Sequence, residues 1–398
     1  MASDPVRTNN IAPHPTLSVT DGGPGAAVLQ RLRFGPWDFG ARAPRVALLL
    51  AVLTWPPLFV LSLIHGVAFG GVQIPFIYDL SAHVRFLFAV PALVLADLAV
   101  GTRLRRTASH FVAAGLVSPS QEGRFAEIIV DTIRFRDSRI AELIVLGAAY
   151  LGTFAALRSG PAHGLTSWFQ MHADGSLAGV NYWYAFVALP VFQFLVFRWV
   201  YRMVVWARFL WQVARLDLQV TPTHPDGAGG LGFLGKSAVA YGPVLFALSA
   251  VTASGIATSI LFGGGKLQTF QSSYIALTVI ALVVFAGPLL VFAPTLMTLK
   301  QQGLVQYGTL ASRYTQLFHR KWVVDGGQTD ESILGSADIQ SLADLGTTFE
   351  MVRKIRIVPI ELADFIAIAI PGVVPAIPLL ATVMPVGDIF KGLLRLLG

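Results

Sequence analysis

Long apolar runs alternate along this chain with short polar stretches rich in arginine and lysine. A helix needs about 20 apolar residues to cross the hydrocarbon core of a bilayer. Six runs meet this need, and they cover approximately residues 45–64, 85–100, 140–157, 182–206, 238–262 and 274–299. The pattern predicts an all-α fold, a polytopic transmembrane helical bundle with six spans and short helical cytoplasmic inserts.

A seventh apolar run, "PIELADFIAIAIPGVVPAIPLLATVMP", contains Pro371, Pro375 and Pro378. Each proline removes a backbone donor and disturbs the preceding helical turn. The run could be one bent span or two half-helices that re-enter the same face. Basic residues on both sides of it favour re-entry, with a break at Pro371–Pro375 and a cytoplasmic C-terminus.

Composition and charge support the membrane class. Of the 398 residues, 54% are hydrophobic and 13% are charged, whereas soluble domains carry about a quarter charged residues. The net charge is +7, and the basic residues that cause it flank the apolar runs. We therefore expect the lipid bilayer as partner and no nucleic acid. The absence of cysteine excludes disulfides, thiol catalysis and Cys-ligated metal centres.

The basic residues also predict a direction. They gather before the first span, between the second and third, between the fourth and fifth and after the sixth, while the opposite loops carry Arg158 and Lys266. By the positive-inside rule the N-terminus and the basic regions are cytoplasmic. We therefore expect a protein of the bacterial inner (plasma) membrane.

The chain divides into four regions on this pattern. Residues 1–30 are polar and predict a disordered tail. Residues 31–299 form the six-span bundle, with cytoplasmic inserts at 102–139 and 207–237. Residues 300–358 form a cytoplasmic helical segment that could dock a protein partner or a second copy. Residues 359–398 hold the proline-broken segment and an interfacial tail.

One cytoplasmic loop, "TPTHPDGAGGLGFLGK" from Thr221 to Lys236, invites a functional interpretation. Its end matches a nucleotide-binding P-loop in letters, but no strand precedes it, which argues against nucleotide. His224 and Asp226 are two possible metal ligands, whereas zinc needs at least three. We favour a structural loop in which Asp226 or Thr223 caps a turn and small or rigid residues allow close backbone packing: Pro225, Gly227, Gly229, Gly230 and Gly232. No cofactor is predicted.

The stretches "LDLQVTPTHPDGAGGLGFLG", "ESILGSADIQSLADL" and "AIPLLATVMP" resemble an uncharacterised bacterial family of multi-pass membrane proteins with an HPDxAGGLGFLG-type cytoplasmic loop. The resemblance covers most of the chain from the fourth span onward. It implies the same membrane architecture and no catalytic residues.

Charged residues inside spans are candidates for a ligand site or pathway, because lipid penalises charge. They are Asp97, Arg198, Glu361 and Asp364. A polar pathway through Asp97, Gln193, Arg198 and Asp364 is one interpretation, and pairs near the inner interface that lock helices together are the other. No catalytic motif is present. The first hypothesis is therefore a small-solute or ion channel or carrier, and the alternative is a membrane scaffold that docks through its cytoplasmic helices.

Overall fold

The computed structural model describes residues 17–20, 22–23, 39–158, 166–169, 179–324 and 337–382. In the first half its main helices are α2 (Phe39–Ile64), α3 (Leu80–His83), η2 (Val84–Ala89), α4 (Val90–Ala113), α5 (Glu122–Arg136), α6 (Arg139–Arg158), α7 (Gly179–Trp183), η5 (Tyr184–Ala188) and α8 (Leu189–Val213). In the second half they are α9 (Gly235–Val239), α10 (Gly242–Gly263), α11 (Leu267–Ala286), η7 (Gly287–Phe292), α12 (Ala293–His319), η8 (Arg320–Val324), α13 (Ala337–Arg353), α14 (Leu362–Val373) and η9 (Val374–Thr382). The described residues contain helices and no strand, which confirms the all-α prediction.

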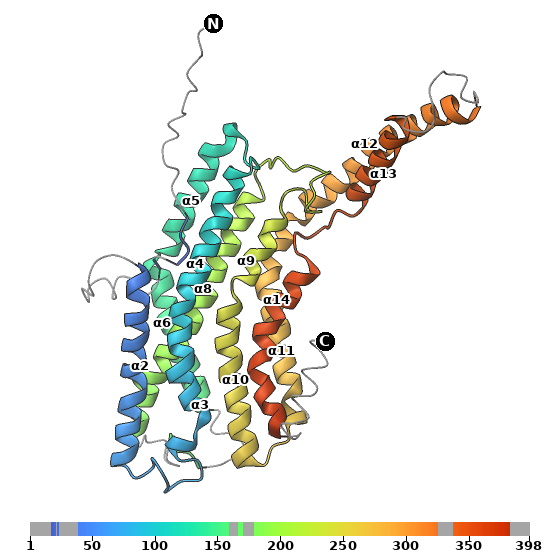
Figure 1. Ribbon diagram of the computed structural model, residues 1–398. Coiled ribbons are helices and arrows are strands. Elements are labelled where there is room, and N and C mark those ends of the chain that lie inside the picture. Colours follow the sequence, from blue (N-terminus) through green and yellow to red (C-terminus); the bar gives the residue numbers. More distant parts are fainter. Residues whose placement is uncertain are drawn as a thin grey trace.

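Within the described residues, seven helical stretches are long and apolar enough to cross a membrane. They run side by side in one bundle (Figure 1). Large apolar side chains cover the outside of α6, where Ile140, Leu143 and Leu151 are about 70% exposed. Such a surface suits lipid and not water. The protein is an integral, multi-pass membrane protein.

The stretches containing α4, α8 and α10 form the centre of the bundle. In their apolar 18-residue stretches, 50%, 50% and 44% of the residues are buried inside the protein. In the stretches of α2, α6 and α14 this share is 22%. The end of the bundle that carries α5 and the Thr221–Leu234 loop is called the basic end below, and the other the opposite end.

Two of the central helices contain a π-helical turn just before a proline. In η2 the N–H of Val90 donates to the carbonyl of Arg85, and in η5 the N–H of Leu189 donates to that of Tyr184. Proline follows at positions 91 and 190. Since proline has no N–H, the carbonyl four residues earlier loses its helical partner; at Phe186 this carbonyl accepts from the hydroxyl of Tyr150 at 3.3 Å. Such turns are rare and often mark functional positions.

The seventh segment does not turn back within the described residues, so the re-entrant prediction is wrong there. Asp364 lies near Gly235, Pro371 near Gly242, and Leu379 packs in a cluster with Ala253 on α10. The two stretches therefore run parallel from the basic end to the opposite end. The prolines convert the backbone from α14 to the 3-10 helix η9, and packing on α10 keeps it straight. The predicted interfacial tail and C-terminus lie outside the described residues.

The prediction of a disordered tail also fails for part of residues 1–30. Leu17, Val19 and Thr20 are at most 2% exposed. An added Cβ on Gly101 of α4 would overlap the Thr20 hydroxyl, so this glycine lets the segment lie directly against the helix. The side chain of Arg136 donates to the carbonyl of Ser18, which ties the segment to α5.

The helical segment that follows the sixth span forms an arm (Figure 1). The helix that begins at Leu267 continues through η7 and α12 to Val324, which makes one helical stretch of 58 residues. The helix α13 returns along it, with Gly303 of α12 against Val352. Asp338 accepts from Lys321 at 2.8 Å and from the indole of Trp322 at 3.1 Å, which holds the far end of the pair together.

Candidate functional site

A cavity of about 410 Å³ with both polar and apolar walls opens between the central helices near the opposite end of the bundle. The residues that line it come from several separate parts of the chain. Arg85 and Tyr184 contribute from the two π-helical turns, Gln193 from α8, Thr252, Gly255, Thr258 and Ser259 from α10, Phe270 from α11, and Ser167 from the short segment 166–169. A cavity at the meeting point of central helices is where membrane proteins commonly hold ligands.

Arg85 is the basic residue of this lining. Its Nη1 donates to the Tyr184 hydroxyl at 2.9 Å and its Nη2 to the Ser81 hydroxyl at 3.2 Å. Its Nε is buried without a hydrogen-bond partner. The ion pairs formed within the described part of the chain do not include Arg85. Its hydrogen-bond partners are therefore neutral hydroxyls, and its Cζ lies 6.0 Å and 5.6 Å from the ring centroids of Phe86 and Phe192.

The acidic residue of the lining, Asp79, has another task. It is 5% exposed and accepts from the indole N–H of Trp168 at 2.9 Å and from the backbone N–H of Ala82 at 3.3 Å. It thus caps α3 and anchors the segment 166–169. Ser167 beside it is 3% exposed, and its hydroxyl has no hydrogen-bond partner.

A second polar cluster lies deep in the bundle, toward the basic end. Asp97 of α4 pairs with Arg202 of α8 and, at 3.4 Å, with Arg198. Arg202 also donates to the carbonyl of Thr20 at 2.8 Å. All three charged residues are at most 7% exposed. Removing one partner of a buried pair leaves an uncompensated charge, which costs about 3–5 kcal/mol, so this cluster locks α4, α8 and the N-terminal segment together.

The Thr221–Lys236 loop is organised around the carboxylate of Asp226. Its oxygens accept from the backbone N–H groups of Ala228 at 2.9 Å, Gly230 at 3.1 Å and Gly232 at 2.7 Å. Gly229 has a φ of +64°, and a Cβ there would come within 2.6 Å of the Leu299 side chain. The prediction that Asp226 caps a turn in a tightly packed loop is confirmed by these contacts.

Electrostatics at Asp226 follow from the same contacts. Burial alone raises its pKa, but the backbone hydrogen bonds from Ala228, Gly232 and Gly230, with the side chain of His224, outweigh burial and lower it. His224 reaches the carboxylate at 2.8 Å. The carboxylate is therefore held in its charged form, and its hydrogen-bonding capacity is largely used inside the loop.

The loop is joined to the start of α14 by a chain of charges. Arg356 donates to the carbonyl of Asp226 at 2.6 Å and to Glu361 at 3.1 Å. Glu361 and Asp364 form a capping box at the N-terminus of α14, and Asp364 accepts from Lys236 at 2.5 Å. Asp364 is 1% exposed, so the prediction that it faces the bundle interior is confirmed.

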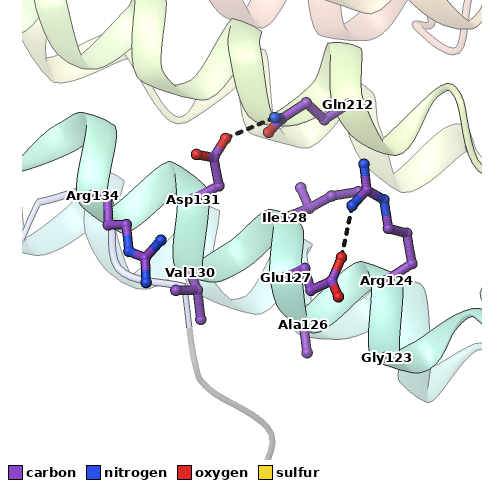
Figure 2. A pocket seen from close by; sticks show the side chains of 9 residues that line it. All are labelled: Gly123, Arg124, Ala126, Glu127, Ile128, Val130, Asp131, Arg134 and Gln212. Carbon is purple, nitrogen blue, oxygen red and sulfur yellow. Dashed lines mark hydrogen bonds and ion pairs between the residues drawn. The ribbon is translucent and has the colours of Figure 1, made fainter.

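A surface hollow of about 520 Å³ follows α5 at the basic end. Figure 2 shows Arg124 reaching Glu127 of the same helix and Asp131 reaching Gln212 of α8. Hydrogen bonds from Arg208 and Gln212 lower the pKa of Asp131. Arg124 and Glu127 are each nearly 70% exposed. The hollow is thus a solvated face with several of its charges already paired.

The structure separates the predicted site residues into two groups. Asp97 and Arg198 meet in the buried lock, while His224, Asp226, Glu361 and Asp364 are linked through Arg356. The predicted pathway companion Gln193 lies in neither group and lines the Arg85 cavity. In the described residues no three potential His, Asp or Glu ligands gather into a metal site.

Sequence reasoning missed the cavity residues Tyr184 and Ser167. A usable signal was present, because Arg85 and Tyr184 each stand six positions before a proline in a central span.

Comparison with protein-family models, with curated proteins and with solved structures finds no match for this chain. The family resemblance described above stays a prediction.

Proposed function

We propose that this membrane protein is a carrier or channel for a small solute, which binds in the cavity around Arg85. The observation that carries the proposal is the cavity itself, which places a guanidinium with unused N–H donors between the central helices. Transporters place such groups where helices depart from regular geometry, and both π-helical turns do so here.

The buried lock suits this function as a closed gate. The helix that carries Arg85 also carries Asp97, and the helix that carries Gln193 also carries Arg198 and Arg202. A solute in the cavity would meet this packed cluster on its way to the basic end. Movement of α4 against α8 would connect occupancy of the cavity with opening of the lock.

Filling the cavity tests the proposal. Gly255 faces it, with the nearest side-chain atom 3.9 Å from an added Cβ, so Gly255→Leu would occupy the space where a solute binds. Gly147→Leu is the matched control, because nothing lies within 4 Å of a Cβ there. Proteoliposomes would be assayed for uptake of labelled benzoate, glycerol and tetraethylammonium.

We expect uptake of at least one probe by the unaltered protein and by Gly147→Leu, and loss of that uptake in Gly255→Leu. Uptake that is absent for all three probes, or unchanged by Gly255→Leu, contradicts a solute carrier that works through this cavity.

The alternative function is a scaffold that docks through the arm of α12 and α13. The observation in its favour is that the arm leaves the bundle (Figure 1) and exposes Leu310, Leu317 and Val323 by more than half. Leu310→Glu together with Leu317→Glu would then disrupt a complex, such as a homo-oligomer measured by light scattering, and leave solute uptake intact. Unchanged mass would count against self-association through the arm.

A further inference from the structure

We infer that the solute of the Arg85 cavity is a small organic carboxylate with an apolar body; this inference rests on the proposed function. Arg85 carries its positive charge into a half-buried site, where the hydroxyls of Tyr184 and Ser81 are its neutral partners. A charge kept from water is costly unless it is paired, and an anionic ligand would supply the missing pair.

The shape of the Arg85 guanidinium also suits a carboxylate. A guanidinium is a planar fork of five N–H donors that matches the two oxygens of a carboxylate. Two of the five donors are used by Tyr184 and Ser81, and the buried Nε has no partner. Each Nη thus keeps one further N–H for a ligand, which is the paired geometry that a carboxylate accepts.

The rest of the cavity wall suits an apolar ligand body. The hydroxyls of Thr252, Thr258 and Ser259 already donate to carbonyls of their own helix, at 3.1, 3.1 and 3.0 Å. Beyond them the wall presents apolar side chains, which are Phe169, Phe192, Phe270 and Ile256. A ligand whose charged group meets Arg85 therefore places its body against aromatic and aliphatic surface.

The alternatives fit less well. A cation would meet Arg85 and an Asp79 whose two oxygens already accept from Trp168 and Ala82. A phosphate or sulfate dianion carries two negative charges, and the lining has one arginine to neutralise them. A monocarboxylate brings one negative charge to the one guanidinium, while Asp79 stays bound to Trp168 and Ala82.

The test compares isosteric ligands with and without charge. Binding of benzoate and of neutral benzamide to the purified protein in nanodiscs would be measured by titration calorimetry, with acetate and inorganic phosphate as further arms. We expect benzoate to bind and benzamide to bind at least about tenfold more weakly, since a hydrogen bond to a charged group is worth that much. Phosphate should bind more weakly than benzoate.

Variants assign the effect to the guanidinium. Arg85→Gln should weaken benzoate binding about tenfold or more and erase its advantage over benzamide. Arg85→Lys keeps the charge, so it should retain part of that advantage even if Arg85→Gln fails to fold. Arg103→Gln, an exposed arginine on α4, is the matched control and should bind benzoate as the unaltered protein does.

Equal binding of benzoate and benzamide, no binding of any carboxylate, or benzoate binding unaffected by Arg85→Gln would overturn the inference. The solute-carrier proposal would survive those results if Gly255→Leu still removed uptake of glycerol or tetraethylammonium. Loss of both effects would end both proposals.

Discussion

At the scale of single residues, the carboxylate of Asp226 accounts for a loop whose letters resemble a nucleotide-binding site. It accepts hydrogen bonds from three backbone N–H groups, and the backbone carbonyl of the same residue accepts one from Arg356. Lys236, which would contact phosphate in a P-loop, pairs with Asp364 instead. The residues of the motif are engaged with one another, which leaves little for a ligand.

Substituting Asp226 by alanine should destabilise the protein by about 2 kcal/mol, because backbone donors lose their acceptor. His224→Ala should change the stability by less than about 0.5 kcal/mol, since the imidazole is 45% exposed and surface substitutions have small effects. Denaturation of both variants in the same detergent measures the difference. Equal destabilisation would show that the imidazole, too, supports the loop.

The lowered pKa of Asp226 also predicts a pH dependence. A carboxyl with a depressed folded-state pKa stabilises the fold above its unfolded pKa of about 3.9, and this stabilisation is lost as the pH falls through the folded value. The difference in melting temperature between the unaltered protein and Asp226→Asn should therefore be full at pH 6 and shrink below pH 4. A difference that stays constant to pH 3 would assign the effect to packing.

At the scale of elements, prolines shape three of the spans in different ways. Before Pro91 and Pro190 the helices form π-helical turns, and at Pro371–Pro378 the backbone changes to a 3-10 helix. The missing donor is the same in each case. The neighbouring helices decide how the backbone accommodates it, as the hydroxyl of Tyr150 does for the carbonyl of Phe186.

Replacing Pro190 by alanine should let η5 relax toward a regular α-helix, because residue 190 regains its N–H. We expect a melting temperature equal to or above that of the unaltered protein and weaker benzoate binding, as Tyr184 moves away from Arg85. Thermal denaturation and calorimetry of one preparation check both. A lower melting temperature with intact binding would mean that the π-helical turn serves stability.

The straight course of the seventh segment predicts a cross-linking pattern. The chain has no cysteine, so engineered pairs give a clean signal. Ala253→Cys with Leu379→Cys should join through a short bismaleimide, because both residues lie in one buried cluster. Gly242→Cys with Leu379→Cys should not join, since Gly242 neighbours Pro371. The reverse pattern would restore a re-entrant segment.

At the scale of the whole molecule, the bundle has the Arg85 cavity at the opposite end and the buried cluster of Asp97, Arg198 and Arg202 toward the basic end. The arm of α12 and α13 extends beyond the basic end (Figure 1). This polarity gives the two ends different tasks in the proposed carrier, with entry of solute at one end and closure at the other.

The orientation of the bundle is tested by labelling intact bacterial cells that express single-cysteine variants. Gln268→Cys at the opposite end and Ser109→Cys at the basic end both replace exposed residues. An impermeant maleimide should label Gln268→Cys from outside and Ser109→Cys only after lysis, because basic loops stay in the cytoplasm. Labelling of Ser109→Cys in intact cells would invert the topology.

The sequence by itself determined the membrane class, the spans and the structural nature of the Asp226 loop. These properties depend on local composition: a run of apolar residues must be covered by lipid or protein, and an Asx-type turn is made by neighbouring residues. Only the tertiary structure decided that Leu17–Thr20 packs into the bundle, that the seventh segment stays straight, and that Arg85 meets Tyr184 rather than a carboxylate. Those outcomes depend on which side chains from distant helices come together, and hydrophobic periodicity along one chain does not contain that information.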